Sequence, residues 1–280
     1  MRCRWVRWVS NAAVAGALTM LAACGSTRAP ITWIIASSAL TRLESVPGAA
    51  VLAKDAFDNA HTYVLVSSGM QPSFLQSWRS VRTIDVTSFS ELAKVVEMGV
   101  PADVRAVVYD QEDWSFTPVA EQKDPSHYMA EAQSLLHEHH LTLIATPATD
   151  LVRAVRTPLG GPSYLAFLHL GLAGAIARYA NIFEIQSQGV EASLGEFTTF
   201  VDQAAAQARS TNPHVIVLAG LSTNPTGHTV TAEELFQDVQ ATRGVVAGYW
   251  LNIPTAGPSC PSCGTPKPEV AAQLLRALEG

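Results

Sequence analysis

The segment Ala106-Val-Val-Tyr-Asp-Gln-Glu-Asp-Trp114 decides how this chain is interpreted. It predicts a buried strand over residues 106–112 that ends in two carboxylates, Asp110 and Glu112. Side chains alternate across a strand, so we expect both acids on one face, about 6.5–7 Å apart along the chain. An apolar strand gains no stability from two like charges there, because each carboxylate loses hydration. The pair therefore indicates a functional site at the end of this strand.

Apolar, β-branched runs of this kind recur along the chain, and amphipathic stretches separate them. The predicted strands cover residues 31–36, 62–67, 82–87, 106–112, 141–146, 181–187, 214–221 and 245–251. The predicted helices cover residues 39–59 with a break near Pro47, 72–80, 88–98, 125–140, 162–180, 193–210, 231–242 and 267–278. Near-continuous apolar strands that alternate with helices are typical of a parallel sheet covered on both faces. Eight such units in this length predict the α/β fold called a (β/α)8 TIM barrel.

The N-terminal residues have the pattern of an export signal rather than of a folded domain. Arg2, Arg4 and Arg7 precede a short apolar run over residues 12–23, which is too short for a permanent membrane span. Leu21-Ala-Ala-Cys24 resembles the bacterial lipobox, in which the cysteine is lipidated and becomes the new first residue. The resemblance implies a signal peptide over residues 1–23, a lipidated Cys24 with a tether over residues 24–30, and a barrel domain over residues 31–280. The protein would then be held on the outer face of the cell membrane.

Composition narrows the partners that such a domain can bind. Removal of the export segment would leave 15 basic and 24 acidic residues, so no basic stripe is available for nucleic acid. Neither a GxGxxG nor a Walker-type loop follows any predicted strand, and we expect no cofactor. Cys260 and Cys263 lie in a Pro/Gly loop, which in an oxidising compartment predicts a small structural disulfide.

Polar side chains gather at the predicted strand ends, where (β/α)8 barrels place their active sites. We expect a carbohydrate site there, since amides and acids bind hydroxyls and a Trp face stacks on a sugar ring. The predicted substrate-binding residues are Trp114, Glu184, Gln186, Gln188, Trp250 and Asn252. A carbohydrate or cell-wall glycan is the predicted partner.

The arrangement resembles the glycoside hydrolase barrels of the chitinase-like kind, and barrel lysozymes also carry Asp-x-Glu on such a strand. The resemblance implies that Glu112 is the general acid and that Asp110 raises the pKa of Glu112 and orients a reacting group. It implies that Trp250 forms the floor of a sugar subsite. The longer chitinase pattern has further aspartates upstream, at places where this chain has Arg105 and Val108.

Several alternatives remain open from the residues alone. A second catalytic carboxylate could be Glu184 or Asp150, and the barrel could also bind a glycan without cleaving it. A metal-dependent hydrolase or phosphodiesterase could use Asp110, Glu112 and Glu184. A metal site at His137, His139 and His140 is not expected, because their order is not HExxH and they precede a strand rather than follow one.

Overall fold

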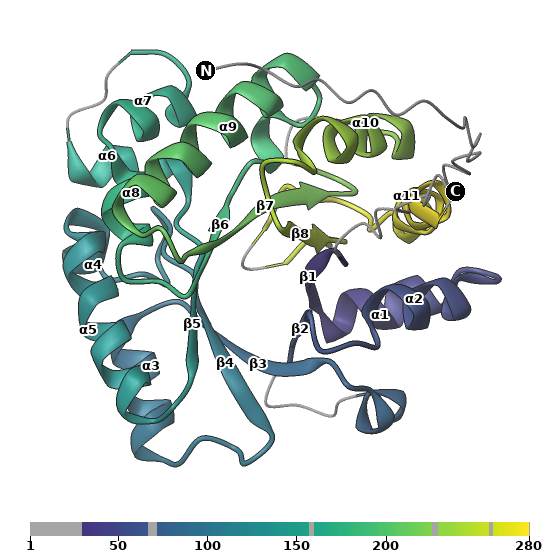
Figure 1. Cartoon of the computed structure of the whole chain (residues 1–280), viewed down its shortest axis with the longest axis horizontal. Coiled ribbons are helices and arrows are strands. Elements are labelled where there is room, and N and C mark those ends of the chain that lie inside the picture. Colours follow the sequence, from purple (N-terminus) through teal and green to yellow (C-terminus); the bar gives the residue numbers. More distant parts are fainter. Residues whose placement is uncertain (1–29, 67–71, 157–159, 226–228, 258–259, 280) are drawn as a thin grey trace, which may run out of the picture. The chain divides into compact units, whose positions relative to one another are not determined.

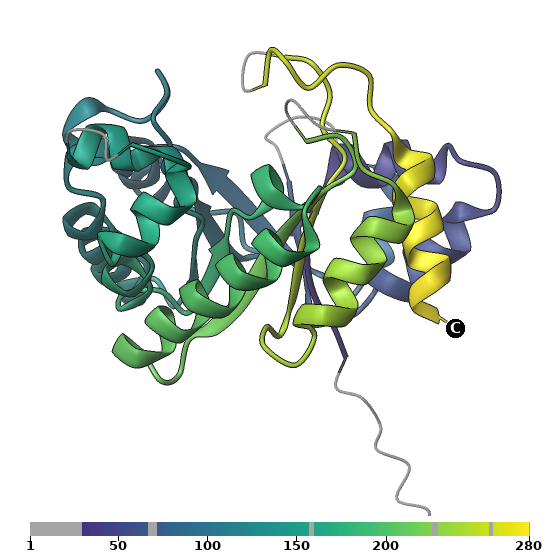
Figure 2. The same ribbon diagram turned by 90° about the horizontal axis from the view of Figure 1, so that it is seen from above.

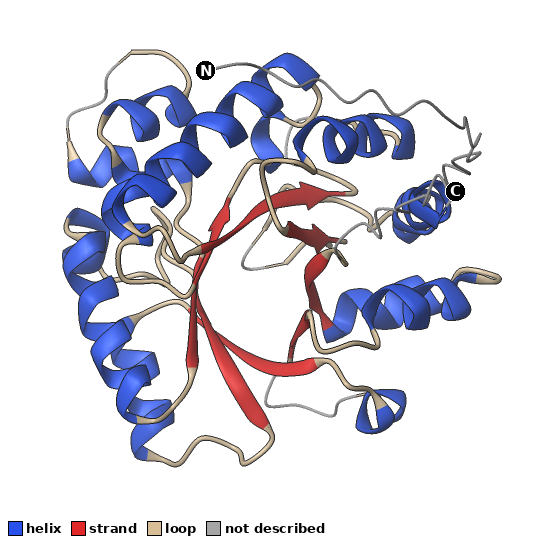
Figure 3. Cartoon of the chain, in the orientation of Figure 1, coloured by secondary structure: helices blue, strands red, loops and turns tan. Residues whose placement is uncertain are grey.

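The predicted apolar runs pair in sequence order and close into one parallel barrel, in which β8 returns to β1 (Figures 1 and 3). This computed structural model describes residues 30–66, 72–156, 160–225, 229–257 and 260–279. Helices lie outside the strands, and the predicted (β/α)8 TIM barrel is confirmed. Residues Ile31–Gly280 group as one compact unit.

The strands are β1 (Thr32–Ala36), β2 (Thr62–Leu65), β3 (Val81–Val86), β4 (Val104–Tyr109), β5 (Thr142–Ala145), β6 (Ile182–Ile185), β7 (Ile216–Ser222) and β8 (Gly248–Asn252). The α-helices are α1 (Ser37–Glu44), α2 (Ala49–Phe57), α3 (Phe89–Glu97), α4 (Val119–Lys123), α5 (Pro125–Glu138), α6 (Val152–Val155), α7 (Ser163–His169), α8 (Leu172–Ala177), α9 (Leu194–Thr211), α10 (Ala232–Thr242) and α11 (Pro268–Glu279). Short 3-10 turns form η1 (Ser73–Ser77), η2 (Thr149–Leu151) and η3 (Gln188–Val190).

Alternation along the strands separates two apolar layers. One layer fills the barrel interior and consists of Ile34, Leu65, Ala106, Val108, Ile144, Ile182, Leu218 and Trp250. The intervening residues, such as Val107 and Tyr109, point outward into the larger core between the strands and the helices. Inward-facing side chains beyond this layer, at the carboxyl ends of the strands, therefore point into the mouth of the barrel.

The barrel closes where β8 pairs with β1, in a register that sets Thr32 opposite Gly248 and Ile34 opposite Trp250. A Cβ added to Gly248 would lie 2.5 Å from the carbonyl carbon of Thr32 and closer still to its oxygen. Glycine inside a strand marks such a close approach of two backbones. Glycine at position 248 therefore allows β8 and β1 to come close enough to pair.

Two of the predicted helices differ in the structure, and α4 and α6 lie outside every predicted helix. The stretch predicted as one helix over residues 162–180 is divided into α7 and α8 by Gly171, which adopts the left-handed conformation at φ 67°. Residues 72–80 form only the turn η1. The start of α10 is fixed by a capping box, in which Glu234 N donates to Thr231 Oγ1 and Thr231 N donates to the Glu234 carboxylate. Among the described residues, no helix has the length and apolar character needed to cross a membrane.

Candidate active site at the barrel mouth

The two acids of the opening segment lie just beyond strand β4 rather than inside it. The strand ends at Tyr109, so the predicted strand over residues 106–112 is three residues too long. Asp110 still continues the sheet, because its N–H donates to Val86 O on β3 at 2.9 Å. Its side chain is 8% exposed, whereas Glu112 is half-buried. The strand therefore delivers one nearly buried acid and one acid open to the mouth.

Gln186, just after β6, brings the two carboxylates together. Its Nε2 donates to Asp110 Oδ1 at 2.9 Å and lies 3.3 Å from Glu112 Oε1. The same nitrogen contacts Thr146 O at 2.9 Å, and Thr146 Oγ1 donates to Asp110 Oδ1 at 3.0 Å. Residues that follow β4, β5 and β6 thus form one hydrogen-bonded group at the mouth. The predicted convergence of Asp110, Glu112 and Gln186 is present, although it depends on neighbouring strands rather than on alternation within one strand.

The loop between β4 and α4 is held in place by Thr117, which is buried. Glu112 N donates to Thr117 Oγ1 at 3.3 Å, and Trp114 Nε1 donates to the same oxygen at 2.8 Å. Trp114 packs edge-on against Phe116, with ring centroids 5.1 Å apart, and Phe116 is 44% exposed. Thr117 therefore fixes both the backbone of Glu112 and an aromatic pair on the rim beside it.

Burial and nearby carboxylates raise the pKa of both acids, but Asp110 is not among the groups that raise the pKa of Glu112, contrary to what the resemblance implied. Burial, followed by the carboxylate of Asp150, raises the pKa of Glu112 to about 7, and the hydrogen bond from Gln186 opposes this rise. Burial and then the Glu112 carboxylate raise the pKa of Asp110 well above its ordinary value. Asp150 accepts a hydrogen bond from Asp113 N at 3.1 Å and pairs with Arg153 at 3.8 Å. Glu112 is thus an acid that holds its proton close to neutral pH.

Asp85 is a further acid at the mouth that the sequence reading did not single out. It follows Thr83 on the inner face of β3, close to the end of the strand at the mouth. Reduced hydration there, followed by repulsion from Glu91, raises the pKa of Asp85 to about 7. The charge of Asp85 in turn raises the pKa of both Asp110 and Glu112. The alternation of Thr83 and Asp85 at the end of a predicted strand was the signal that could have identified it.

Glu184 does not reach the open mouth that was predicted for it, whereas Gln188 is half-buried. Glu184 is completely buried, none of its carboxylate oxygens has a hydrogen-bond partner, and burial raises its pKa well above the ordinary value. A Cβ at Gly220 on β7 would lie 2.5 Å from both Glu184 Oε1 and Gln188 Cδ, so both side chains pack over this glycine. β6 ends at Ile185, and Gln188 begins η3 instead of extending the strand. Glu184 is therefore enclosed within the barrel, which does not fit a direct substrate contact or a role as the second catalytic carboxylate.

The remaining predicted ligand contacts lie on β8. Trp250 is 8% exposed and belongs to the inner apolar layer, directly below the mouth. Its Nε1 is buried without a hydrogen-bond partner. Asn252 ends the strand half-buried, and its carbonyl accepts from Thr223 N at 2.9 Å. Trp250 and Asn252 thus form part of the floor and wall of the mouth.

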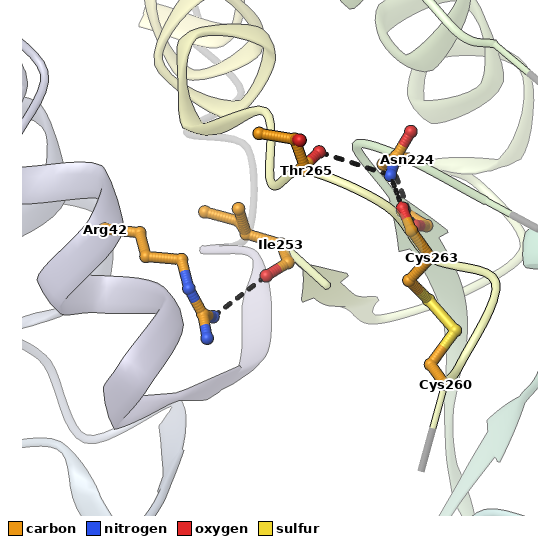
Figure 4. Close-up of a disulfide and its surroundings, with 7 residues drawn as sticks. Arg42, Asn224, Ile253, Cys260, Cys263 and Thr265 are labelled. Atoms are coloured by element: carbon orange, nitrogen blue, oxygen red, sulfur yellow. Dashed lines mark hydrogen bonds between the residues drawn. A yellow bond between two sulfur atoms is a disulfide. The ribbon is translucent and has the colours of Figure 1, made fainter. Parts of the chain in front are cut away.

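The predicted disulfide between Cys260 and Cys263 is present in the loop between β8 and α11 (Figure 4). Asn224 Nδ2, from the loop after β7, donates to Cys263 O and lies 3.4 Å from Thr265 O. Figure 2 shows this loop, in yellow, projecting at the end of the barrel where the strands finish. The disulfide therefore stiffens a loop that is tied to its neighbour at the mouth.

Metal chemistry gains no support from side-chain geometry. Within the part of the chain that the structure describes, no group of three or more His, Cys, Asp or Glu side chains is arranged to hold a metal ion. His139 and His140 lie between α5 and β5, at the end of the barrel opposite the acids. A metal-dependent hydrolase built on Asp110, Glu112 and Glu184 would also need an accessible Glu184, but this side chain is completely buried.

Comparison with solved structures finds the same fold in three proteins. A chitinase from Chromobacterium violaceum matches with a TM-score of 0.52 at 12% identity, over 89% of this chain and 99% of that one. The spore cortex-lytic enzyme SleL of Bacillus megaterium matches with a TM-score of 0.51 at 10% identity, over 91% of this chain and 74% of that one. A class V chitinase from Pseudomonas fluorescens matches with a TM-score of 0.50 at 12% identity, over 90% and 99%.

The chain has the fold of glycoside hydrolase barrels. No family model and no curated protein sequence matches it. At these identities the likeness concerns the architecture, and the role of each residue rests on the geometry of the mouth.

Proposed function

We propose that this protein is a glycoside hydrolase in which Glu112 is the general acid and Asp110 is its charged or hydrogen-bonding assistant. The observation that carries the proposal is the pairing of the two acids through Gln186 at the mouth of the barrel. Cleavage of a glycosidic bond needs a carboxylic acid that is still protonated near neutral pH. The pKa of about 7 at Glu112 meets that need.

The spacing of the acids favours one class of mechanism. Asp110 Oδ1 and Glu112 Oε1 both lie close to Gln186 Nε2, so they can be no more than about 6.2 Å apart. That is shorter than the ≈ 6.5–9.5 Å that inverting enzymes leave for a water between their carboxyl groups. Glu112 would give its proton to the leaving glycosidic oxygen and take one back from the attacking water. Retention would follow, because a nucleophile, either Asp110 or a substrate group that Asp110 orients, would attack the anomeric carbon from the face opposite the leaving oxygen before the water displaces it.

A carbohydrate fits the remaining lining of the mouth. Trp250 supplies a floor, and Trp114 with Phe116 supplies an aromatic edge beside Glu112. Aromatic faces that stack on the apolar face of a sugar, with amides and acids for its hydroxyls, are the expected composition of such a site. The chitinase-like fold of the neighbours points to the same class of substrate.

The proposal is tested by reducing-end release from a panel of polysaccharides and cell-wall glycans. Turnover that requires Glu112 supports hydrolysis. Binding of a glycan without turnover, by the wild-type chain and across the whole panel, would instead make the barrel a non-catalytic glycan-binding protein.

Asp150 gives a test through the pH profile. Its carboxylate is the largest charge effect that raises the pKa of Glu112, and Asp150→Asn removes that charge. The pKa of Glu112 should fall, so Glu112 should lose its proton at lower pH. We expect the alkaline limb of kcat/KM to move to lower pH by at least about 0.5 unit, which is a difference of roughly 0.7 kcal/mol. An alkaline limb that stays in place would show that Glu112 is not the group being titrated.

We also propose that the protein is exported and held at the membrane surface by a lipidated Cys24. Residues 1–29 lie outside the described residues, and the support is the lipobox-like Leu21-Ala-Ala-Cys24 after an apolar run. Cys24→Ser should move the protein from the membrane fraction to the soluble fraction of cells. Cys3→Ser, in the same segment, should leave it in the membrane fraction. Retention of the Cys24→Ser variant at the membrane would contradict lipid anchoring.

A further inference from the structure

A pocket of about 320 Å³ opens on the side of Gln186 away from β3 and β4. It is lined by Thr149, Pro162, Ser163, Tyr164, Gln186, Gly189, Val190, Glu196 and Phe200. Apart from Gln186, these residues come from η2, the start of α7, η3 and α9. α7 packs against η2 and against α9, and Figure 1 shows α7 beside α9. Ligand pockets commonly measure ≈ 300–1,000 Å³, so this one suits a small unit.

The pocket adjoins the acids, because one side chain belongs to both. Gln186 lines it and at the same time contacts Asp110 and Glu112. A glycan with its scissile bond at Glu112 would therefore have an adjacent sugar unit beside the pocket.

The walls of the pocket combine an aromatic surface with hydroxyl groups. Tyr164 packs on Phe200 with ring centroids 5.3 Å apart, and its hydroxyl donates to Glu196 Oε1 at 3.3 Å. The hydroxyls of Thr149 and Ser163 are 3.0 Å apart. An apolar ring face beside several hydrogen-bonding groups is the composition that a sugar ring requires.

The charges around the pocket exclude one class of sugar. No lysine, arginine or histidine is among the lining residues, and Glu196 contributes a carboxylate. Arg153 on α6 is engaged with Asp113 and Asp150. An anionic sugar would meet uncompensated negative charge, whereas a site lined by one sign of charge attracts ligands of the opposite sign.

We propose that this pocket is a binding subsite for one sugar unit that carries no negative charge, with Glu196 accepting a hydrogen bond from a hydroxyl or amino group of that unit. Unit sugars with a free ammonium group should be preferred, and uronic acids should be rejected. The inference rests on the proposed function, because it assumes that the mouth binds a glycan.

The test compares three β-1,4-linked pentasaccharides that share a backbone and differ in charge. They are the neutral glucose pentamer, the cationic glucosamine pentamer and the anionic glucuronic acid pentamer. Binding is measured by titration calorimetry on the full chain carrying Glu112→Gln, so that no bond is cleaved. We expect the glucuronic acid pentamer to bind at least tenfold more weakly than the neutral pentamer, and the glucosamine pentamer to bind most tightly.

Variants of the chain then show whether the charge preference comes from the pocket. Adding Glu196→Gln should weaken binding of the glucosamine pentamer at least fivefold and should narrow its advantage over the neutral pentamer. Leu165→Ala is the matched control, because Leu165 is 47% exposed on α7 and does not line the pocket. It should leave all three affinities within twofold.

Three results would overturn the assignment. They are equal affinity for the anionic and neutral pentamers, unchanged glucosamine binding in the Glu196→Gln variant, and binding of none of the three. The outcome is separate from the proposed function. Charge-selective binding by a wild-type chain that cleaves nothing would refute the hydrolase alone, and Glu112-dependent cleavage that is insensitive to Glu196→Gln would refute the pocket alone.

Discussion

Glu112→Gln is expected to lower kcat for glycan hydrolysis by about 10²–10⁴-fold, the usual contribution of a positioned acid or base. Glutamine has nearly the shape of glutamic acid, and its carbonyl oxygen can still accept from Gln186 Nε2. It cannot, however, give a proton to the leaving oxygen. Binding of a glycan should therefore persist while turnover is lost.

The loss is measured as reducing-end release on whichever glycan the wild-type chain cleaves. Glu138→Gln makes the same chemical change on an exposed residue near the opposite end of the barrel, and its kcat should equal that of the wild type. A Glu112→Gln variant that retains kcat within twofold would remove Glu112 from the mechanism.

Gly248→Ala should have the largest effect on stability. The added Cβ would collide with the backbone of Thr32 on β1, which has no side-chain rotation available to relieve the contact. Relief requires β8 and β1 to separate, and that breaks the pairing by which the barrel closes. We expect a loss of at least about 3 kcal/mol, against a total of roughly 5–15 kcal/mol for a folded protein.

Urea denaturation followed by circular dichroism measures this loss. The control is Gly244→Ala in the turn before β8, where an added Cβ meets no atom within 4 Å. The control should stay within about 0.5 kcal/mol of the wild type, as most surface substitutions do. Equal urea midpoints for Gly248→Ala and Gly244→Ala would show that the β8–β1 pairing tolerates a side chain at position 248.

The barrel was predictable because its strands are buried on both faces. A strand in that environment must be apolar along its whole length, so each run stands out against the amphipathic helices. The division at Gly171 was not predictable in this way, since glycine also occurs inside continuous helices. The excess length assigned to β4 has a different cause, because hydrogen bonds to β3 and to the residues after β5 continue at Asp110 and Gln111 after the strand itself ends at Tyr109.

The candidate site was predictable in part. Strand ends identified Asp110, Glu112 and Gln186, but their connection requires the register of β4, β5 and β6. The enclosure of Glu184 depends on Gly220, which lies on another strand. The pocket joins Tyr164 to Glu196 across 32 positions of sequence, and no local pattern marks that contact.

The amide nitrogen of Gln186 has one hydrogen fewer than the number of acceptors around it. A primary amide nitrogen carries two hydrogens, yet three acceptors lie within reach of this one. Thr146 O and Asp110 Oδ1 both lie 2.9 Å from this nitrogen, so Glu112 Oε1, at 3.3 Å, accepts the weakest of the three hydrogen bonds. Glu112 is thus the most weakly held member of the group, and it can turn toward an arriving glycosidic oxygen while the other two contacts stay intact.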